Sequence, residues 1–142
     1  MKRLFFLFLG FFIIVADLLT KIWAVSSDEI VSTINYGISW GIGSYGWRSG
    51  VVFAVLSLCI VFLCWSYARV RLLAHKNINA EILIMSGALG NILSRMIYHG
   101  GVVDFIDISY LIGHSFPLFN IADVAIFFGV ILLFIREFFY ES

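Results

Sequence analysis

Charged side chains are scarce in this sequence. Of its 142 residues, 9 are Lys or Arg and 9 are Asp or Glu, whereas 62% are hydrophobic and 18% are aromatic. Soluble domains carry roughly a quarter charged and roughly half apolar residues, so the composition excludes a soluble globular domain. The hydrophobicity also excludes a disordered chain. The net charge of zero leaves no basic surface for nucleic acid. An integral membrane protein remains.

Proline and cysteine are also rare. Pro117 is the only proline, and with 12 glycines the sequence is neither collagen-like nor linker-like. The two cysteines, Cys59 and Cys64, fall in one apolar stretch and provide no disulfide framework. We expect both to be buried thiols.

Four stretches are long and apolar enough to cross a bilayer, which takes about 20 mostly apolar residues. They cover residues 4–25, 51–68, 82–98 and 118–135. The sequence therefore predicts an all-α membrane protein with four transmembrane helices, in a single domain over residues 1–142. Lys2 and Arg3 precede the first stretch as they would in a cleaved signal peptide, but Asp17 and Lys21 continue it with charges. We expect a retained helix.

Lysine and arginine in the short loops predict the orientation of the chain. Six of them flank the apolar stretches on one side: Lys2, Arg3, Arg69, Arg71, Lys76 and Arg136. We expect this side, with both termini, to be cytoplasmic. On the opposite side Arg48 is the only cation, because the loop over residues 99–117 has neither Lys nor Arg. The pattern is that of a multi-pass membrane protein.

The longer outer loop, residues 26–50, has its own composition. Its glycines alternate with aromatic residues: Gly37, Gly41, Gly43, Gly46 and Gly50 with Tyr36, Trp40, Tyr45 and Trp47. Glycine permits turns and close backbone approach, and aromatic rings suit the headgroup region. The loop is therefore either an interfacial hairpin or a small β-rich unit that forms one wall of a site. Its glycines also favour a mobile lid over residues 32–46.

Polar residues inside the apolar stretches gather at one depth. Counted at about 1.5 Å per residue, all of them lie in the outer half of the bilayer: Asp17, Lys21, Asn91, Arg95, Asn120 and Asp123. Ionisable groups inside membrane spans are costly and are functional candidates by default. A purely structural alternative is an internal Asp17–Lys21 ion pair, four residues apart on one helix face, with interhelical hydrogen bonds from Asn91 and Arg95.

Asp104, in the second outer loop, and Asp123 are candidates for paired-carboxylate chemistry. Two carboxylates held close together in a low dielectric cannot both ionise readily. One then keeps a proton and acts as an acid while the other acts as a base, and such a pair can activate water without a metal. His99, Asp107 and His114 share the loop of Asp104, but their spacing matches no zinc pattern. We expect no metal and no cofactor.

Five segments, in order along almost the whole chain, resemble the motifs of one family. They are DLLTK at 17–21 (D-x-x-T-K), NYGISWG at 35–41 (N-x-G-x-x-[FW]-G), GALGNILSR at 87–95 (G-x-x-G-N-x-x-D-R), VVDFI at 102–106 and FPLFNIAD at 116–123. The chain thus resembles the lipoprotein signal peptidases (signal peptidase II), the intramembrane aspartyl peptidases of bacteria. Ser94 stands where the family usually has Asp. We expect its uncharged hydroxyl to tune the hydrogen bonds of Arg95.

The resemblance implies that Asp104 and Asp123 are the catalytic dyad. The residues that it implies for the supporting, substrate-binding shell are Asp17, Lys21, Asn35, Gly37, Asn91, Arg95 and Asn120. It also implies cleavage of the signal peptide of a prolipoprotein immediately before a cysteine that carries diacylglycerol. It further implies a multi-pass protein of the bacterial cytoplasmic (inner) membrane, with the active site near the extracytoplasmic surface. We expect a monomer in contact with membrane lipid.

Two other classes of function are open to the residues alone. An ion-coupled transporter would use Asp17, Lys21 and Asp123 as relay groups, but transport sites usually lie near the midplane with access from both sides. The inner halves of the predicted spans are apolar, which argues against that class. A scaffold protein without catalysis would not need two carboxylates and several polar side chains in the outer leaflet.

Overall fold

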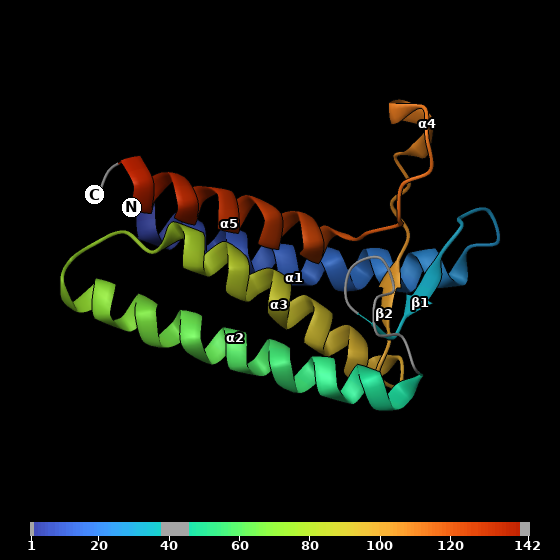
Figure 1. Cartoon of the computed structure of the whole chain (residues 1–142), viewed down its shortest axis with the longest axis horizontal. Helices are drawn as coiled ribbons and strands as arrows, with labels where there is room; N and C mark the ends of the chain where they lie inside the picture. Colours follow the sequence, from blue (N-terminus) through green and yellow to red (C-terminus); the bar gives the residue numbers. More distant parts are fainter. Residues whose placement is uncertain (1, 38–45, 140–142) are drawn as a thin grey trace.

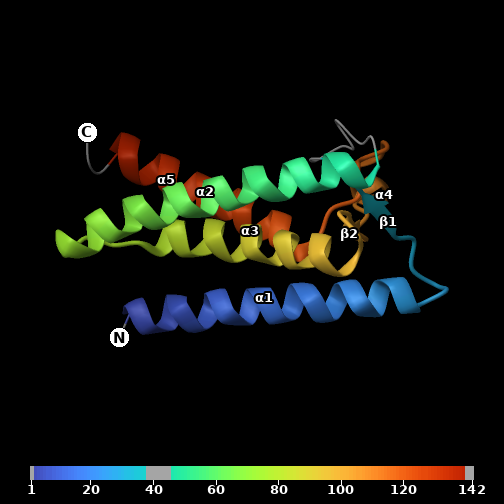
Figure 2. The same cartoon turned by 90° about the horizontal axis from the view of Figure 1, so that it is seen from below.

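The computed structural model describes residues 2–37 and 46–139. Four long helices run side by side along one axis (Figures 1 and 2): α1 (Lys2–Ser26), α2 (Trp47–Leu73), α3 (Asn79–Ile97) and α5 (Ile121–Phe139). Two short strands, β1 (Thr33–Asn35) and β2 (Val102–Asp104), and a short helix, α4 (Ser109–Ile112), lie at one end of the bundle. At the other end α1 begins, α5 ends and α2 connects to α3. The fold is therefore mostly helical, as predicted, with a small sheet.

Among the residues that the structure describes, three helices are long and apolar enough to cross a membrane. They are α1, over Leu4–Ser26, and the whole of α2 and of α3. Helix α5 has 19 residues but carries three charged side chains, Asp123, Arg136 and Glu137. It also begins at Ile121 rather than at 118, because Phe119 forms a β-bridge with Ile106. Helix α2 extends beyond both ends of the predicted stretch 51–68.

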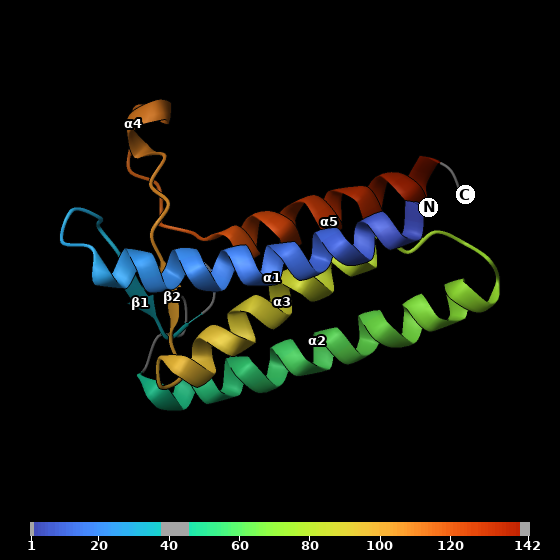
Figure 3. The ribbon, with the colours of Figure 1, turned by 180° about the vertical axis from the view of Figure 1, so that it is seen from behind.

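Helix α3 is the centre of the bundle, with α2 on one side and α1 and α5 on the other (Figure 3). Its glycines allow two close approaches. A Cβ atom on Gly87 would overlap the backbone carbonyl oxygen of Ala122, and one on Gly90 would lie 2.7 Å from a carboxylate oxygen of Asp17. The absence of side chains at these positions brings the start of α5 and the carboxylate of α1 against α3, where the polar residues gather.

The sheet joins the two outer loops. Strand β1, from the loop between α1 and α2, pairs antiparallel with β2, which follows α3, and Thr33 lies opposite Asp104. The prediction of a β-rich loop between the first two helices is therefore right for β1, but the partner strand comes from the other loop. The remainder of the glycine- and aromatic-rich segment, with Trp40, Gly41, Gly43 and Tyr45, lies outside the described residues, as does most of the predicted lid.

Helix α2 turns one long apolar face outward. Val55, Leu58, Phe62 and Leu63 are all exposed along it. Cys59 is exposed on the same helix, and Cys64 is only partly buried, so the prediction of two buried thiols is wrong. The helix packs mainly on α3 and leaves its remaining surface to the surroundings, which for such an apolar surface are the lipid chains.

Charged residues also meet at the end of the bundle opposite the sheet. Glu81 is 1% exposed, and its two carboxylate oxygens accept hydrogen bonds of 2.7 and 3.0 Å from the Arg136 guanidinium. Arg71, 4% exposed, lies 3.7 Å from Glu81. Tyr67 donates a hydrogen bond to Glu137, which also pairs with Arg136. The sequence indicates only an orientation role for Arg71 and Arg136, whereas in the structure their side chains link α2, α3 and α5.

Candidate active site

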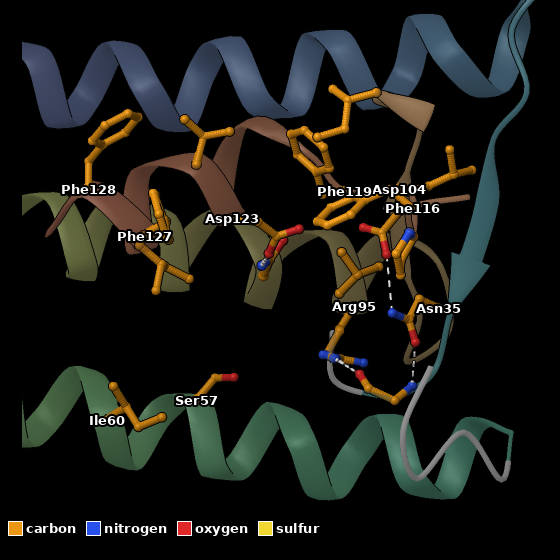
Figure 4. A pocket seen from close by; sticks show the side chains of 18 residues that line it. Asn35, Ser57, Ile60, Arg95, Asp104, Phe116, Phe119, Asp123, Phe127 and Phe128 are labelled. Atoms are coloured by element: carbon orange, nitrogen blue, oxygen red, sulfur yellow. Dashed lines mark hydrogen bonds between the residues drawn. The ribbon is translucent and has the colours of Figure 1, made fainter. Parts of the chain in front are cut away.

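A cavity of about 720 Å³ lies between α2 and α5, next to the sheet. Asp104 and Asp123 line one wall, and Ser57 and Ile60 of α2 lie across from them (Figure 4). Most of the lining is apolar, with Phe127 among its aromatic side chains. The cavity therefore places two carboxylates at the edge of a largely apolar space.

The start of α5 positions Asp123. The Asn120 side-chain oxygen accepts a hydrogen bond of 3.0 Å from the Asp123 amide, and Asp123 Oδ2 accepts one of 3.2 Å from the Asn120 amide. This reciprocal pair is a capping box, which satisfies backbone donors that the first turn leaves without partners. A further donor of this turn, the Ala122 amide, bonds to Asp17 Oδ1 of α1 at 2.9 Å. Local capping and the neighbouring helix thus fix the Asp123 carboxylate.

Asp104, at the end of β2, is held by two asparagines. Asn120 donates to its Oδ1 at 2.6 Å and Asn35 donates to its Oδ2 at 3.1 Å. Asn120 therefore contacts both aspartates, one through each end of its side-chain amide. Burial and the nearby Asp123 carboxylate raise the pKa of Asp104 to about 6, although the two asparagine hydrogen bonds act in the opposite direction. Asp104 can thus keep a proton well above the pH at which an exposed aspartate loses it.

A chain of polar side chains supports Asp123 from behind. Lys21 and Asp17 pair at 2.7 Å with both side chains fully buried, which confirms the predicted ion pair. Lys21 Nζ also donates to the side-chain oxygen of Asn91 at 2.8 Å, and the Asn91 NH₂ group donates to Asp123 Oδ1 at 2.9 Å. Because the ammonium group can only donate, it fixes which end of the Asn91 amide faces Asp123.

Arg95 connects α3 to both outer loops. Its guanidinium donates to the carbonyl oxygen of Gly100 at 2.8 Å and to that of Gly37 at 2.6 Å. It also lies over the ring of Phe53 in α2, 5.8 Å from the centroid. The side chain therefore holds the end of the β1 segment against the cavity, where Gly37 is part of the lining.

Ser94 has a different role from the predicted one. Its fully buried hydroxyl accepts a hydrogen bond from the Val103 amide at 3.3 Å. Among the described residues, the hydrogen bonds of the Arg95 guanidinium go to Gly37 and Gly100 and not to this hydroxyl. Val103 precedes Asp104 in β2. The hydroxyl thus anchors the strand that carries a dyad candidate, which the sequence pattern alone did not indicate.

We expect Ser94→Ala to leave the Val103 amide buried without an acceptor. An unsatisfied buried donor costs about 1–3 kcal/mol, so the thermal midpoint of the purified protein should fall. Ser86→Ala is the matched control, since Ser86 is also buried in α3 but its hydroxyl donates to Ile82 of its own helix. An equal or smaller loss for Ser94→Ala would contradict the anchoring role.

The predicted site residues divide into two layers. The residues that line the cavity are Asn35, Gly37, Asn91, Arg95, Asp104 and Asp123. Asp17, Lys21 and Asn120 lie behind this layer and reach it through hydrogen bonds. Among the described residues, no three His, Cys, Asp or Glu side chains come together as metal ligands. The sequence did not indicate that Ser57 and Ile60 of α2 and Phe127 of α5 line the cavity, because periodicity does not distinguish a cavity-facing residue from a lipid-facing one.

Known proteins are similar to this chain over nearly its full length. A family model described as signal peptidase (SPase) II matches residues 9–139. The lipoprotein signal peptidase of Pasteurella multocida is 34% identical, covering 94% of this chain and 88% of the relative. That of Bacillus velezensis is 34% identical and covers 92% of each chain. A bacterial membrane enzyme solved by the in meso method at 2.3 Å resolution has a TM-score of 0.78 and 28% identity, covering 96% of this chain and 89% of that one.

Proposed function

The chain belongs to the signal peptidase II family, and we propose from this premise that it cleaves the signal peptide from diacylglyceryl-modified prolipoproteins, immediately before the lipidated cysteine. The observation that carries the proposal is the pair Asp104 and Asp123 on one wall of an apolar cavity, bridged by Asn120. The product would be a free signal peptide and a lipoprotein with an amino-terminal lipidated cysteine.

The proposed mechanism is that of an aspartic endopeptidase, without a cofactor. One carboxylate of the dyad removes a proton from water as the water oxygen attacks the scissile carbonyl carbon. The other, protonated, donates a hydrogen bond to the carbonyl oxygen. As the tetrahedral intermediate collapses, the C–N bond breaks and a dyad proton moves to the leaving amine of the cysteine. The raised pKa of Asp104 supports a proton shared by the pair near neutral pH.

The supporting shell would orient both the dyad and the peptide. Asn35 and Asn120 hold Asp104, and Asn91 holds Asp123. Arg95 lines the cavity and donates to the carbonyl oxygens of Gly37 and Gly100. It would thereby keep Gly37 at the cavity edge, where the absence of a side chain leaves room for the extended peptide.

The membrane arrangement supports a lipid-linked substrate. We propose that α5 is a fourth span, that both termini are cytoplasmic and that the sheet end faces the outside, in a monomer of the bacterial inner membrane. The cavity is bordered by α2 and α5. The side chains of Phe127 and Phe128 in α5 are exposed and would adjoin the lipid. The diacylglyceryl chains would enter between these two helices from the bilayer, while the scissile bond lies at the outer surface.

The proposal is tested by comparing two substrates that differ only in their lipid. Purified protein is incubated with a synthetic prolipoprotein peptide that carries diacylglycerol on its cysteine, and with the same peptide without lipid. We expect kcat/KM to be at least about 100-fold higher for the lipidated peptide, since each buried CH₂ of the acyl chains contributes about 0.8 kcal/mol. Equal cleavage of both peptides would contradict recognition of the lipid.

The raised pKa of Asp104 also predicts how stability depends on pH. Its pKa is about 6 in the folded protein and 3.8 in the ordinary case, so the folded state binds the proton more tightly. Protonation of Asp104 therefore adds about 2–3 kcal/mol to the free energy of unfolding. This contribution is fully present below about pH 4 and is lost as the pH rises through 6. Asp104→Asn removes this titration.

Thermal midpoints measured from pH 4 to pH 7.5 check this expectation. The midpoint of Asp104→Asn, relative to that of the unmodified protein, should increase with pH across this range. Asp107→Asn, in the same loop but at an exposed residue, is the control and should lack that increase. Parallel pH profiles for Asp104→Asn and the unmodified protein would show that Asp104 does not titrate near pH 6.

A further inference from the structure

The second outer loop carries a projecting segment that the dyad does not use. We call residues 107–116, which contain α4, the α4 loop. At its base Ile106 and Phe119 form an antiparallel bridge, with hydrogen bonds of 2.8 and 3.2 Å. One step further out, the Ser109 hydroxyl accepts from the Phe116 amide at 2.9 Å. The loop is thus a closed hairpin with a defined neck, and α4 lies beyond that neck.

The tip of the α4 loop is apolar and almost without protein contacts. Tyr110 is 96% exposed and Leu111 is 80% exposed. Gly113, with φ +74°, ends the helix in the left-handed conformation that glycine adopts without strain. A structured segment that presents its tyrosine and leucine outward differs from an ordinary polar loop, because water is an unfavourable environment for these side chains.

The direction of the α4 loop indicates what covers it. In Figures 1 and 3, α4 stands out sideways from the sheet end of the bundle, away from the axis along which the long helices run. If those helices cross the bilayer, a sideways extension at their outer end runs along the membrane surface. In Figure 1 it projects on the side of the bundle where α5 lies, and α5 exposes apolar side chains that include Phe127 and Phe128.

The chemistry of the tip fits the boundary between headgroups and acyl chains. Tyrosine is enriched there because its ring is apolar and its hydroxyl is polar, and leucine reaches into the acyl region. The loop over residues 99–117 has no Lys or Arg, so its insertion would depend on the apolar side chains rather than on attraction to anionic headgroups. We propose that the α4 loop is an interfacial anchor, with Tyr110 and Leu111 inserted into the outer leaflet of the bilayer.

An anchored tip would act on the cavity through the neck. Ile108 and Phe116 lie at the neck and also line the cavity. With the tip held in the interface, this part of the wall is kept at the level of the membrane surface, where a lipid-linked cysteine must be presented. The inference rests on the orientation given in the proposed function, but it does not require that the protein be a peptidase.

The depth of a spin label at Leu111 tests the anchor. Leu111→Cys is made in a Cys59→Ala/Cys64→Ala background, labelled with a nitroxide and reconstituted at low protein density into phosphatidylcholine–phosphatidylglycerol vesicles. Power saturation compares the accessibility of the label to oxygen, which partitions into lipid, and to a water-soluble nickel chelate. Asp28→Cys, in the exposed outer loop, and Phe62→Cys, on the outward face of α2, are the aqueous and lipid controls.

We expect the Leu111 label to be at least about threefold less accessible to nickel than the Asp28 label, with oxygen accessibility between those of the two controls, as at an interfacial depth of about 5–10 Å. Nickel accessibility equal to that of Asp28 would place the tip in water and overturn the proposal. Low accessibility to both reagents would place the tip against the protein, and dipolar broadening between labels would indicate a second copy. Either result would also overturn it. Because the readout is depth, none of these outcomes depends on peptidase activity.

Discussion

Asparagine at position 104 or at position 123 is expected to abolish cleavage of the lipidated substrate. Each substitution keeps the size of the side chain but removes the group that takes or supplies the proton in the proposed mechanism. General acid–base catalysis contributes about 10²–10⁴-fold for each group, and the two aspartates act as one unit, so the loss in either single variant should approach that of the double variant. We expect kcat to fall by at least about 1,000-fold in each variant.

The double variant and a variant of an exposed aspartate are the controls for this prediction. Asp107→Asn is the same chemical change, three residues from Asp104, at a carboxylate that accepts a hydrogen bond from the Ser109 amide, and it should keep nearly full activity. The two dyad variants should still unfold cooperatively at pH 5, which shows that the loss is chemical. If either folded variant kept more than about one tenth of the activity of the unmodified protein, a catalytic role for that aspartate would be contradicted.

Removal of the Lys21 ammonium is expected to have the largest effect on stability. Lys21 and Asp17 are fully buried, and the ammonium also fixes the Asn91 amide. Lys21→Met keeps most of the volume but leaves a buried carboxylate without its cation. Breaking a buried pair in this way costs about 3–5 kcal/mol, so the thermal midpoint should fall sharply. Activity should fall as well, because Asn91 loses the contact that orients it toward Asp123.

A double-mutant cycle separates the charge from the packing. Asp17→Asn/Lys21→Met removes both charges, so it should be more stable than Lys21→Met alone, although Asn91 remains without the ammonium. Arg69→Met removes an exposed cation and should change the midpoint little. If Lys21→Met and Arg69→Met had equal midpoints, the buried pair would not stabilise the bundle.

Local spacing allowed much of the site to be predicted. Asp17 and Lys21 are one helical turn apart, and Asn120 and Asp123 span the first turn of a helix, so their contacts follow from helix geometry. The bond from Asn35 to Asp104 joins residues 69 positions apart. It depends on the pairing of β1 with β2, which no local pattern specifies. The family resemblance, rather than physical reasoning, linked these residues.

The inner end of the bundle shows the opposite case. Glu81 precedes an apolar stretch in the sequence. Arg71 and Arg136 indicate only which side of the membrane is cytoplasmic, because the sequence shows them as cations that flank the apolar stretches. In the structure, Glu81 is buried and holds two arginines. A charge count between loops predicts orientation but not which cations find a carboxylate, since that depends on how the helices pack. The neck and tip of the α4 loop were missed for a similar reason, because its exposure depends on the direction of the hairpin.

Identification of the cleavage products tests the central claim most directly. Purified protein in lipid is incubated with a synthetic diacylglyceryl prolipoprotein peptide, and the products are analysed by mass spectrometry. The account predicts a signal peptide that ends at the residue before the cysteine and a lipidated peptide with a free cysteine amine, neither of which Asp104→Asn or Asp123→Asn produces. An intact substrate, a cut at another bond, or the same two products from both asparagine variants would contradict it.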